Sequence, residues 1–146
     1  MNIKQNMKFN KFIPELSVTN LDRSLKFYLD LGFKIEYERK ENKFVFLSLE
    51  GSQLMLEEGV GNMESRFYVG KVEPPFGRGL HFQIELRDLD KIISALQKNN
   101  YTIKSQPVDN WFRQGKKLLG MRNILVQDPD GYLLMFHQDL GTKPAI

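Results

Sequence analysis

The stretch that decides the fold is LDRSL at residues 21–25, because it returns as LDKII at residues 89–93. The two stretches lie 68 residues apart, and the same shift carries Ile35 onto Ile103 and Ile13 onto His81. A pattern that repeats at a fixed offset indicates an internal duplication. We therefore expect two copies of one half-domain, which open toward a shared groove where a ligand binds.

Size and composition narrow the classes of protein to consider. The 146 residues fit one domain or two small fused halves, with 41% hydrophobic residues and no cysteine, so neither disulfides nor thiolate metal sites are expected. Residues 1–8 lack the apolar run of a signal peptide, and no stretch approaches the roughly 18 apolar residues of a membrane span. The net charge of +3 is scattered along the chain. We expect a cytoplasmic protein with no nucleic-acid partner and no membrane partner.

The first half follows a β-α-β-β-β pattern over residues 9–58, after a flexible tail at 1–8. A strand over 9–18 precedes a helix that begins at Leu21, with Asn20 as its N-cap and Gly32 as its stop. Strands are expected over 34–40, 44–49 and 53–57, and Gly51-Ser52 forms the turn between the last two.

The second half repeats the pattern over residues 80–139, after a connecting segment at 59–79 that is rich in Gly and Pro. Asp88 is expected to cap the helix, and Asn99-Asn100 to end it. Strands are expected over 80–86, 102–106, 122–127 and 132–138, with a long loop over 109–120 and a tail over 140–146. The sequence DPDG at 128–131 forms a turn.

Side chains alternate between the two faces of a strand, so each strand has one apolar and one mixed face. The apolar faces are expected to lie under the helices. The mixed faces carry Phe44, Phe46, Met55 and Met135. An uncovered sheet would expose these side chains as an apolar patch, and such patches mark binding or subunit surfaces. We therefore expect a groove on the mixed faces.

Two motifs carry a resemblance to a known family. The sequence NLDRSLKFY at 20–28, followed by LGF at 31–33, and the sequence QDPDGY at 127–132 resemble the opening and closing motifs of the vicinal oxygen chelate superfamily. This superfamily comprises glyoxalases, extradiol dioxygenases, and bleomycin- and fosfomycin-resistance proteins. Within it the chain is most similar to the bleomycin-resistance branch, on PEL at 14–16, LMLE at 54–57 and LGM at 119–121.

The resemblance implies an α+β fold. Two βαβββ modules form a curved mixed sheet around a groove, with the helices on the outer face. It also implies a homodimer.

The metal-dependent branches of this superfamily place one ligand on each of four strands. The matching positions here are Ile13, Met55, His81 and Met135. Alkyl and thioether side chains do not hold a borderline divalent ion, so we predict no metal and no other cofactor. An alternative is a displaced site formed by Glu15, Glu57, His81 and His137.

His81 is the only candidate catalytic residue, as a general base or hydrogen-bond donor. The alternative is a neutral imidazole that Gln83, a glutamate or water satisfies.

The resemblance also places Trp111 in a loop that borders the ligand cavity, where its ring stacks on the ligand or anchors the loop. The side chains expected to bind a ligand are Trp111, Phe44, Phe46, Met55, His81, Gln83, Arg113 and Met135. A mainly apolar wall with few polar groups is typical of small-molecule pockets.

Three functions remain open on these residues. The first is metal-free capture of a small, partly aromatic molecule, such as an antibiotic, which would confer antibiotic resistance. The second is a metal-dependent enzyme of the glyoxalase or thiol-transferase type that uses His81 with Glu57 or Glu15. The third is a groove used only for dimerisation.

Overall fold

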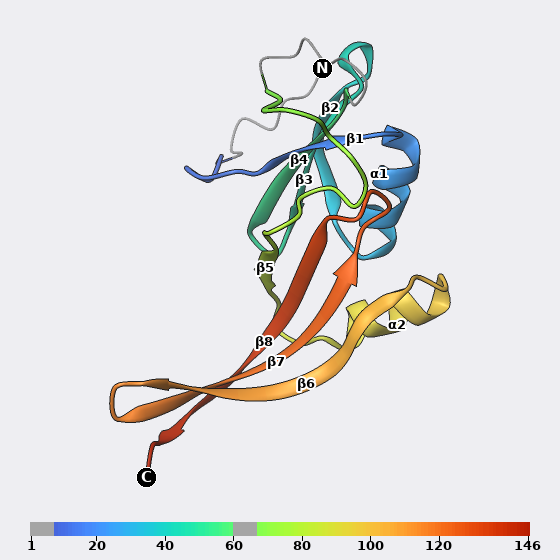
Figure 1. The fold of residues 1–146 in the computed structure, drawn as a ribbon. Helices are drawn as coiled ribbons and strands as arrows, with labels where there is room; N and C mark the ends of the chain where they lie inside the picture. Colours follow the sequence, from blue (N-terminus) through green and yellow to red (C-terminus); the bar gives the residue numbers. More distant parts are fainter. Residues whose placement is uncertain (1–7, 60–66) are drawn as a thin grey trace. The chain divides into compact units, whose positions relative to one another are not determined.

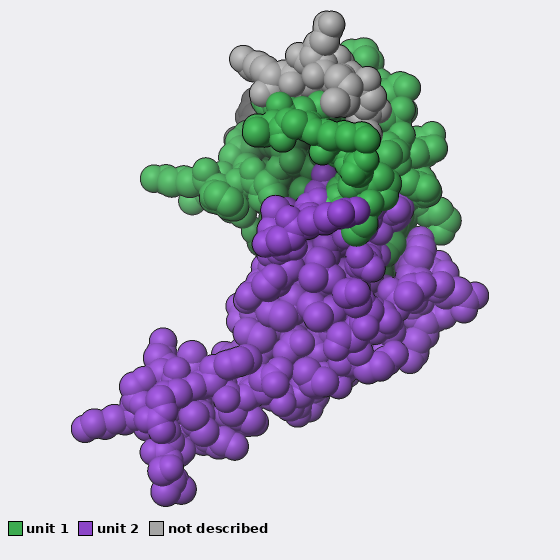
Figure 2. Space-filling view, viewed as in Figure 1, with its two compact units in different colours: residues 1–76 green, residues 77–146 purple. Residues whose placement is uncertain are grey.

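The computed structural model describes residues 8–59 and 67–146 of the chain. The chain forms two compact units, residues 1–76 (unit 1) and residues 77–146 (unit 2), which Figure 2 shows in green and purple. Most of the tail expected at 1–8, and residues 60–66 of the expected connecting segment, lie outside the described residues.

Unit 1 contains a four-stranded mixed sheet and one α-helix (Figure 1). Its elements are β1 (Glu15–Val18), α1 (Leu21–Asp30), β2 (Lys34–Arg39), a 3-10 turn η1 (Lys40–Asn42), β3 (Phe44–Leu49) and β4 (Ser52–Glu58). The strand order is β1-β4-β3-β2, and only the β1–β4 pair is parallel.

Unit 2 repeats this architecture with longer strands. Its elements are β5 (Phe82–Glu85), α2 (Asp90–Lys98), β6 (Ile103–Gln114), β7 (Lys117–Gln127) and β8 (Leu133–Pro144). The order is β5-β8-β7-β6, again with one parallel pair, β5–β8. The α+β fold of two βαβββ modules is confirmed.

The strand registers show how close the duplication is. Glu15 lies opposite Met55 and Ser17 opposite Glu57 in the β1–β4 pair. In the β5–β8 pair, Gln83 lies opposite Met135 and Glu85 opposite His137. The shift of 68 residues carries Glu15 onto Gln83 and Ser17 onto Glu85, so each half presents the same positions with different chemistry.

The local signals for the first helix are confirmed. The Asn20 side chain accepts a hydrogen bond from the Arg23 N–H at 3.0 Å, and Gly32 follows the helix with a φ of +104°. The Glu58 Oε2 atom accepts from the Leu21 N–H at 3.0 Å, which ties the start of α1 to the end of β4. A free N–H at a helix start is therefore satisfied by a strand of the same unit.

The apolar faces form the two cores, as the alternation predicts. The fully buried side chains of unit 1 come from α1 and from the inner faces of its strands, among them Phe27, Tyr28, Val18, Leu47 and Leu56. Those of unit 2 are Leu89, Ile92, Leu96, Ile124, Val126, Leu134 and Phe136.

Three expectations about the elements are wrong. Residues 109–120 are not a loop, because β6 and β7 continue as a hairpin to Gln114 and Lys117, with Gly115 at a φ of +62° in the turn. Residues 140–144 are not a tail, because they pair with β7. This extension is exposed on both faces along β6, so it lacks the apolar alternation that identifies a half-buried strand.

The third concerns Asp88, which satisfies the first N–H of α2 but does not occupy the N-cap position. Its Oδ1 atom accepts from the Asp90 N–H at 3.0 Å, and Leu89 occupies the cap position without a side-chain bond. The Leu89 N–H instead donates to Gln138 Oε1 at 3.2 Å.

Substitution of Asn20 tests whether the N-cap hydrogen bond stabilises the protein. Asn20→Ala should lower the free energy of unfolding by about 1 kcal/mol, because a first-turn N–H loses its acceptor. Asn20→Ser is the matched control and should retain most of that stability. Urea denaturation of the two variants measures the difference; equal stability would show that the cap contributes nothing here.

Candidate functional site

A pocket of about 330 Å³ opens on unit 1, on the sheet face opposite the buried core. Small-molecule sites are concave surfaces of this kind. Its walls come from the ends of β1 and β4 and from the segment that follows β4. The lining residues are Glu15, Ser17, Glu57, Glu58, Gly59, Phe67 and Tyr68.

A pair of carboxyl groups lies in this pocket because β1 and β4 run in parallel. Glu15 and Glu57 lie on adjacent strands with their side chains on one face, offset by two residues in register. Burial, and then the hydrogen bond and negative charge of Glu57, raise the pKa of Glu15 above its ordinary value, while Arg39 opposes the shift. Two neighbouring carboxylates repel each other when both are ionised, and a positively charged ligand between them would relieve that repulsion.

Glu58 has a different role in the same wall. Its carboxylate accepts from the Leu21 N–H and lies 3.2 Å from the Lys43 Nζ. These two contacts, the backbone bond first, lower the pKa of Glu58 below its ordinary value. Glu58 is therefore held as an ionised structural group, and the Glu15–Glu57 pair remains for a ligand.

The aromatic part of the pocket comes from Phe67 and Tyr68. Phe67 is 67% exposed, an unusual state for a phenyl ring beside a cavity. Gly59 leaves room for Tyr68, because a Cβ atom there would lie 3.1 Å from the Tyr68 Oη. The pocket is thus lined by both hydrogen-bond acceptors and aromatic side chains.

Phe44 and Phe46 were expected to be exposed on this face, and that expectation is wrong, since both are buried. The segment before β1 crosses the sheet, and Phe9 stacks on Phe46 with ring centroids 5.2 Å apart. The guanidinium of Arg39 lies 4.0 Å from the centre of the Phe44 ring. Neither ring lines the pocket, nor does Met55, which lies opposite Glu15 in the parallel pair.

Unit 2 places the other expected ligand contacts on its own sheet. Gln83 and Met135 face each other across β5 and β8. The Gln83 Nε2 lies 3.3 Å from the His81 Nε2, so His81 has the amide partner that the simpler interpretation foresaw. His81 lies just before β5.

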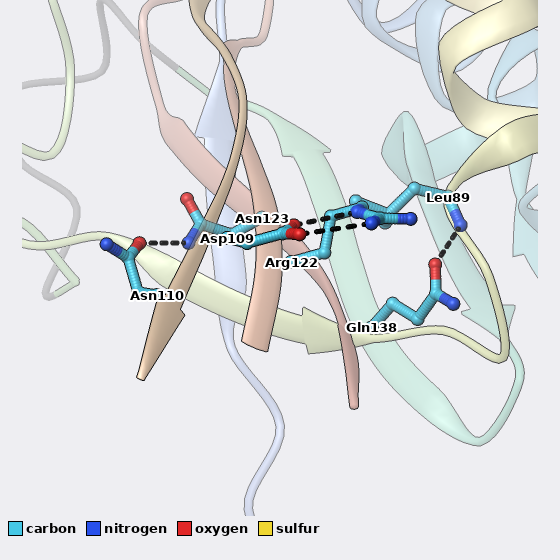
Figure 3. Close-up of polar contacts among 6 residues, drawn as sticks. All are labelled: Leu89, Asp109, Asn110, Arg122, Asn123 and Gln138. Carbon is cyan, nitrogen blue, oxygen red and sulfur yellow. Dashed lines mark hydrogen bonds and ion pairs between the residues drawn. The ribbon is translucent and has the colours of Figure 1, made fainter. Parts of the chain in front are cut away.

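Polar contacts cross the β6–β7 hairpin of unit 2 (Figure 3). The Asn123 Nδ2 donates to Asn110 Oδ1 at 3.0 Å, and Asn123 is almost fully buried. On the other face, the Arg122 guanidinium donates to both carboxylate oxygens of Asp109, at 2.8 and 3.1 Å. This bidentate pair lowers the pKa of Asp109. The guanidinium of Arg122 is therefore engaged by Asp109 within the hairpin.

Trp111 and Arg113 lie on the same hairpin, in β6. The Trp111 ring lies over Gly120 on β7, where a Cβ atom would come within 2.6 Å of the ring. The Lys143 Nζ lies 4.0 Å from the ring centre. Trp111 remains 37% exposed, and Arg113 is exposed beside it.

The positions that match the family's metal ligands remain Ile13, Met55, His81 and Met135. Among the residues that the structure describes, no three His, Asp or Glu side chains are grouped closely enough to hold a metal ion. Of these four side chains only the His81 imidazole is a suitable ligand, and a single imidazole is too few to hold a divalent catalytic ion.

Sequence reasoning named Glu15 and Glu57 as ligands of an alternative metal site and as acidic residues of the groove, and it missed Ser17, Phe67 and Tyr68 as pocket residues. Phe67 and Tyr68 follow the stretch of Gly and charged residues after β4, where no periodic pattern marks a wall. Only the parallel register of β1 and β4 brings Glu15 and Glu57 together.

Comparison with known proteins agrees with this architecture. The family model of the Glyoxalase/Bleomycin resistance protein/Dioxygenase superfamily matches residues 9–136. The chain belongs to this superfamily. No curated protein matches the chain closely enough to indicate a function.

Several solved structures share the fold at low sequence identity. A glyoxalase/bleomycin resistance protein/dioxygenase from Alicyclobacillus acidocaldarius is 20% identical with a TM-score of 0.62, covering 90% of this chain and 92% of that one. A virulence protein from Salmonella typhimurium is 19% identical with a TM-score of 0.64, covering 90% and 98%. A glyoxalase/dioxygenase from Nostoc punctiforme is 20% identical with a TM-score of 0.62, covering 87% and 88%. At these identities the likeness shows the fold alone.

In the described part of the chain, neither helix has the length and apolar character needed to cross a membrane.

The carboxyl pair predicts a pH-dependent stability. The pKa of Glu15 is higher in the folded protein than its ordinary value of 4.5, so the folded state loses stability as the pH rises through that interval. Glu15→Gln removes the ionisation and keeps a hydrogen-bonding side chain. The variant should exceed the wild type at pH 7 by less than about 1 kcal/mol, because water screens a partly exposed pair.

Thermal unfolding between pH 4 and pH 7 measures this difference, which should vanish at the acid end. Glu41→Gln, at an exposed position outside the pocket, is the control and should not change the pH profile. A Glu15→Gln profile parallel to that of the wild type would contradict the raised pKa of Glu15.

Proposed function

We propose that the protein binds a small, partly aromatic molecule without a metal ion, and that the pocket of unit 1 is the ligand-binding site. The ligand class is an organic amine or another molecule whose N–H donors meet the Glu15–Glu57 pair. Its aromatic part contacts Phe67 and Tyr68. Capture of this kind sequesters the ligand, and an antibiotic is one such ligand.

The observation that carries this proposal is the placement of Glu15 and Glu57 on adjacent strands in a pocket that Phe67 and Tyr68 also line. A carboxylate accepts strong, charge-assisted hydrogen bonds from an ammonium group. Phe67 and Tyr68 beside the pair add apolar contact, and a ring whose face turns toward a cation attracts it. A pocket of about 330 Å³ has the volume of a small-molecule site.

The donor set supports capture over metal catalysis. Ile13, Met55 and Met135 occupy three of the four positions where metal-dependent members of the superfamily carry ligands. Elemental analysis of protein purified without chelator should find far less than one divalent ion per chain. Zinc, nickel, manganese or iron near one ion per chain would favour an enzyme that uses His81 with Glu57 or Glu15.

Binding is tested with two probes that share one ring and differ in charge. Tryptamine, a cation at neutral pH, should bind in isothermal titration calorimetry, while indole-3-acetate should bind at least about tenfold more weakly, since the carboxylates repel it. The double variant Glu15→Gln/Glu57→Gln should weaken tryptamine binding about tenfold or more.

Glu41→Gln is again the control and should bind tryptamine like the wild type. Equal affinity for the two probes, binding of neither probe, or tryptamine binding that the double variant leaves unchanged would each contradict the proposal.

A further inference from the structure

The segment just before β1 lies on the open face of the unit 1 sheet. We call residues 8–12 the strap; they form no helix or strand, and each of them is exposed. After the strap the chain is held to the sheet, because the Met55 N–H donates to the Pro14 carbonyl oxygen at 3.0 Å. A short piece of irregular backbone therefore covers strands whose opposite face belongs to the core.

The strap places one aromatic ring on the sheet. Phe9 stacks on Phe46 with ring centroids 5.2 Å apart and an interplanar angle of 16°, and it meets Tyr37 edge-on at 6.3 Å and 77°. Tyr37 and Phe46 also contact each other, at 5.4 Å. Stacked and edge-on geometries at these distances are the favoured arrangements of aromatic pairs. Tyr37 and Phe46 thus form a ring-binding surface, which Phe9 fills.

The next ring in the sheet has a cover of its own. The Arg39 guanidinium lies 4.0 Å from the centre of the Phe44 ring and 5.8 Å from that of Tyr37. Arg39 is the register partner of Phe44 in the β2–β3 pair, so the sheet itself sets this contact. If the strap left the sheet, Phe44 would keep the guanidinium, whereas Phe46 would lose the Phe9 ring.

The contacts that hold the strap are exposed to water. The Asn10 N–H donates to Gln53 Oε1 at 2.7 Å, and the Gln53 Nε2 donates to the Lys8 carbonyl oxygen at 2.6 Å. The Asn10 Nδ2 donates to the Gly51 carbonyl oxygen at 3.0 Å. Water replaces such bonds at a small net cost in free energy. Phe9 itself remains 52% exposed, so it gains only part of the hydrophobic free energy that full burial would give.

We infer that Tyr37 and Phe46 form a binding site for an aryl group, and that Phe9 is an intramolecular competitor that leaves when such a group binds. The ligand class is a molecule with an uncharged ring of phenyl size, because the site holds a ring of that size in Phe9. A tethered competitor lowers the apparent affinity by the fraction of molecules in which the site is open. The strap therefore sets a threshold that a ligand ring must exceed.

The ring site lies in one row with the carboxyl pair of the pocket. Glu15, Met55, Phe46 and Tyr37 are successive register partners across β1, β4, β3 and β2. Neighbouring strands lie about 4.8 Å apart, so two strand spacings, roughly 10 Å, separate Glu15 from Phe46. A ligand with an amine and an aryl group at that separation would reach both sites. The inference does not rest on the proposed function, because the Phe9 contacts involve no charged group.

The probe is p-cresol, an uncharged ring that tests this site without the carboxyl pair. Amide chemical shifts in two-dimensional NMR spectra give both its dissociation constant and its place on the chain. The wild type should bind it with shifts concentrated in β2 and β3. Phe9→Ala should bind it at least tenfold more tightly, because the competitor is absent. Phe12→Ala is the matched control, at an 85% exposed position of the same strap, and should bind like the wild type.

A tether distinguishes a strap that leaves the sheet from a permanent cover. The chain has no cysteine, so the variant Asn10→Cys/Gln53→Cys carries only the two introduced thiols. Bismaleimidoethane links these thiols and holds the strap on the sheet, whereas N-ethylmaleimide caps them without a link. The linked protein should bind p-cresol at least tenfold more weakly than the capped protein.

A permanent cover would give different results. Equal affinity of the linked and capped proteins, no tighter binding by Phe9→Ala, or binding by Phe9→Ala with none by the wild type would each overturn the inference. Shifts concentrated at Ser17 and Tyr68 would place p-cresol in the pocket and would also overturn it. Tryptamine binding without p-cresol binding would retain the proposed function and remove the ring site.

Discussion

The parallel pairing of the first and last strands in each unit is the constraint on which the rest of the structure depends. Parallel neighbours point residues of matching register to the same face, so the β1–β4 pair fixes which side chains share the open surface of unit 1. The buried face is determined by Leu16, Val18, Leu54 and Leu56, and a shift of one residue would exchange the two faces. The core therefore fixes the position of the Glu15–Glu57 pair, although neither carboxyl group is part of the core.

The duplication gives the two units one architecture and allows different chemistry at equivalent positions. Where unit 1 has Glu15 and Glu57, unit 2 has Gln83 and His137. Unit 1 places two carboxyl groups in one pocket, whereas unit 2 has an amide next to a methionine and an imidazole next to a glutamate. Unit 2 also has longer last strands, since β6, β7 and β8 exceed β2, β3 and β4 in length.

The sequence predicted the fold well because its signals are local. The Asn20 cap, the Gly32 stop and the apolar alternation each act within a few residues, and the structure confirms them. The extension of the β6–β7 hairpin was missed because strand β6 is exposed on both faces there and lacks the alternation that marks a strand. The burial of Phe44 and Phe46 was missed because Phe9, which covers Phe46, belongs to a segment interpreted as part of the first strand. The pocket depends on strand register and on the segment after β4, and neither is visible in local patterns.

The central claim is that the Glu15–Glu57 pair binds a ligand cation, and that binding favours the ionised form of Glu15, whose pKa is raised in the free protein. The measurement that tests it most directly is calorimetric titration with tryptamine near pH 5 in two buffers whose ionisation enthalpies differ. The account predicts that the observed heat changes with the buffer, because each binding event releases part of a proton, and that Glu15→Gln removes this dependence. A binding heat that is the same in both buffers would contradict the account.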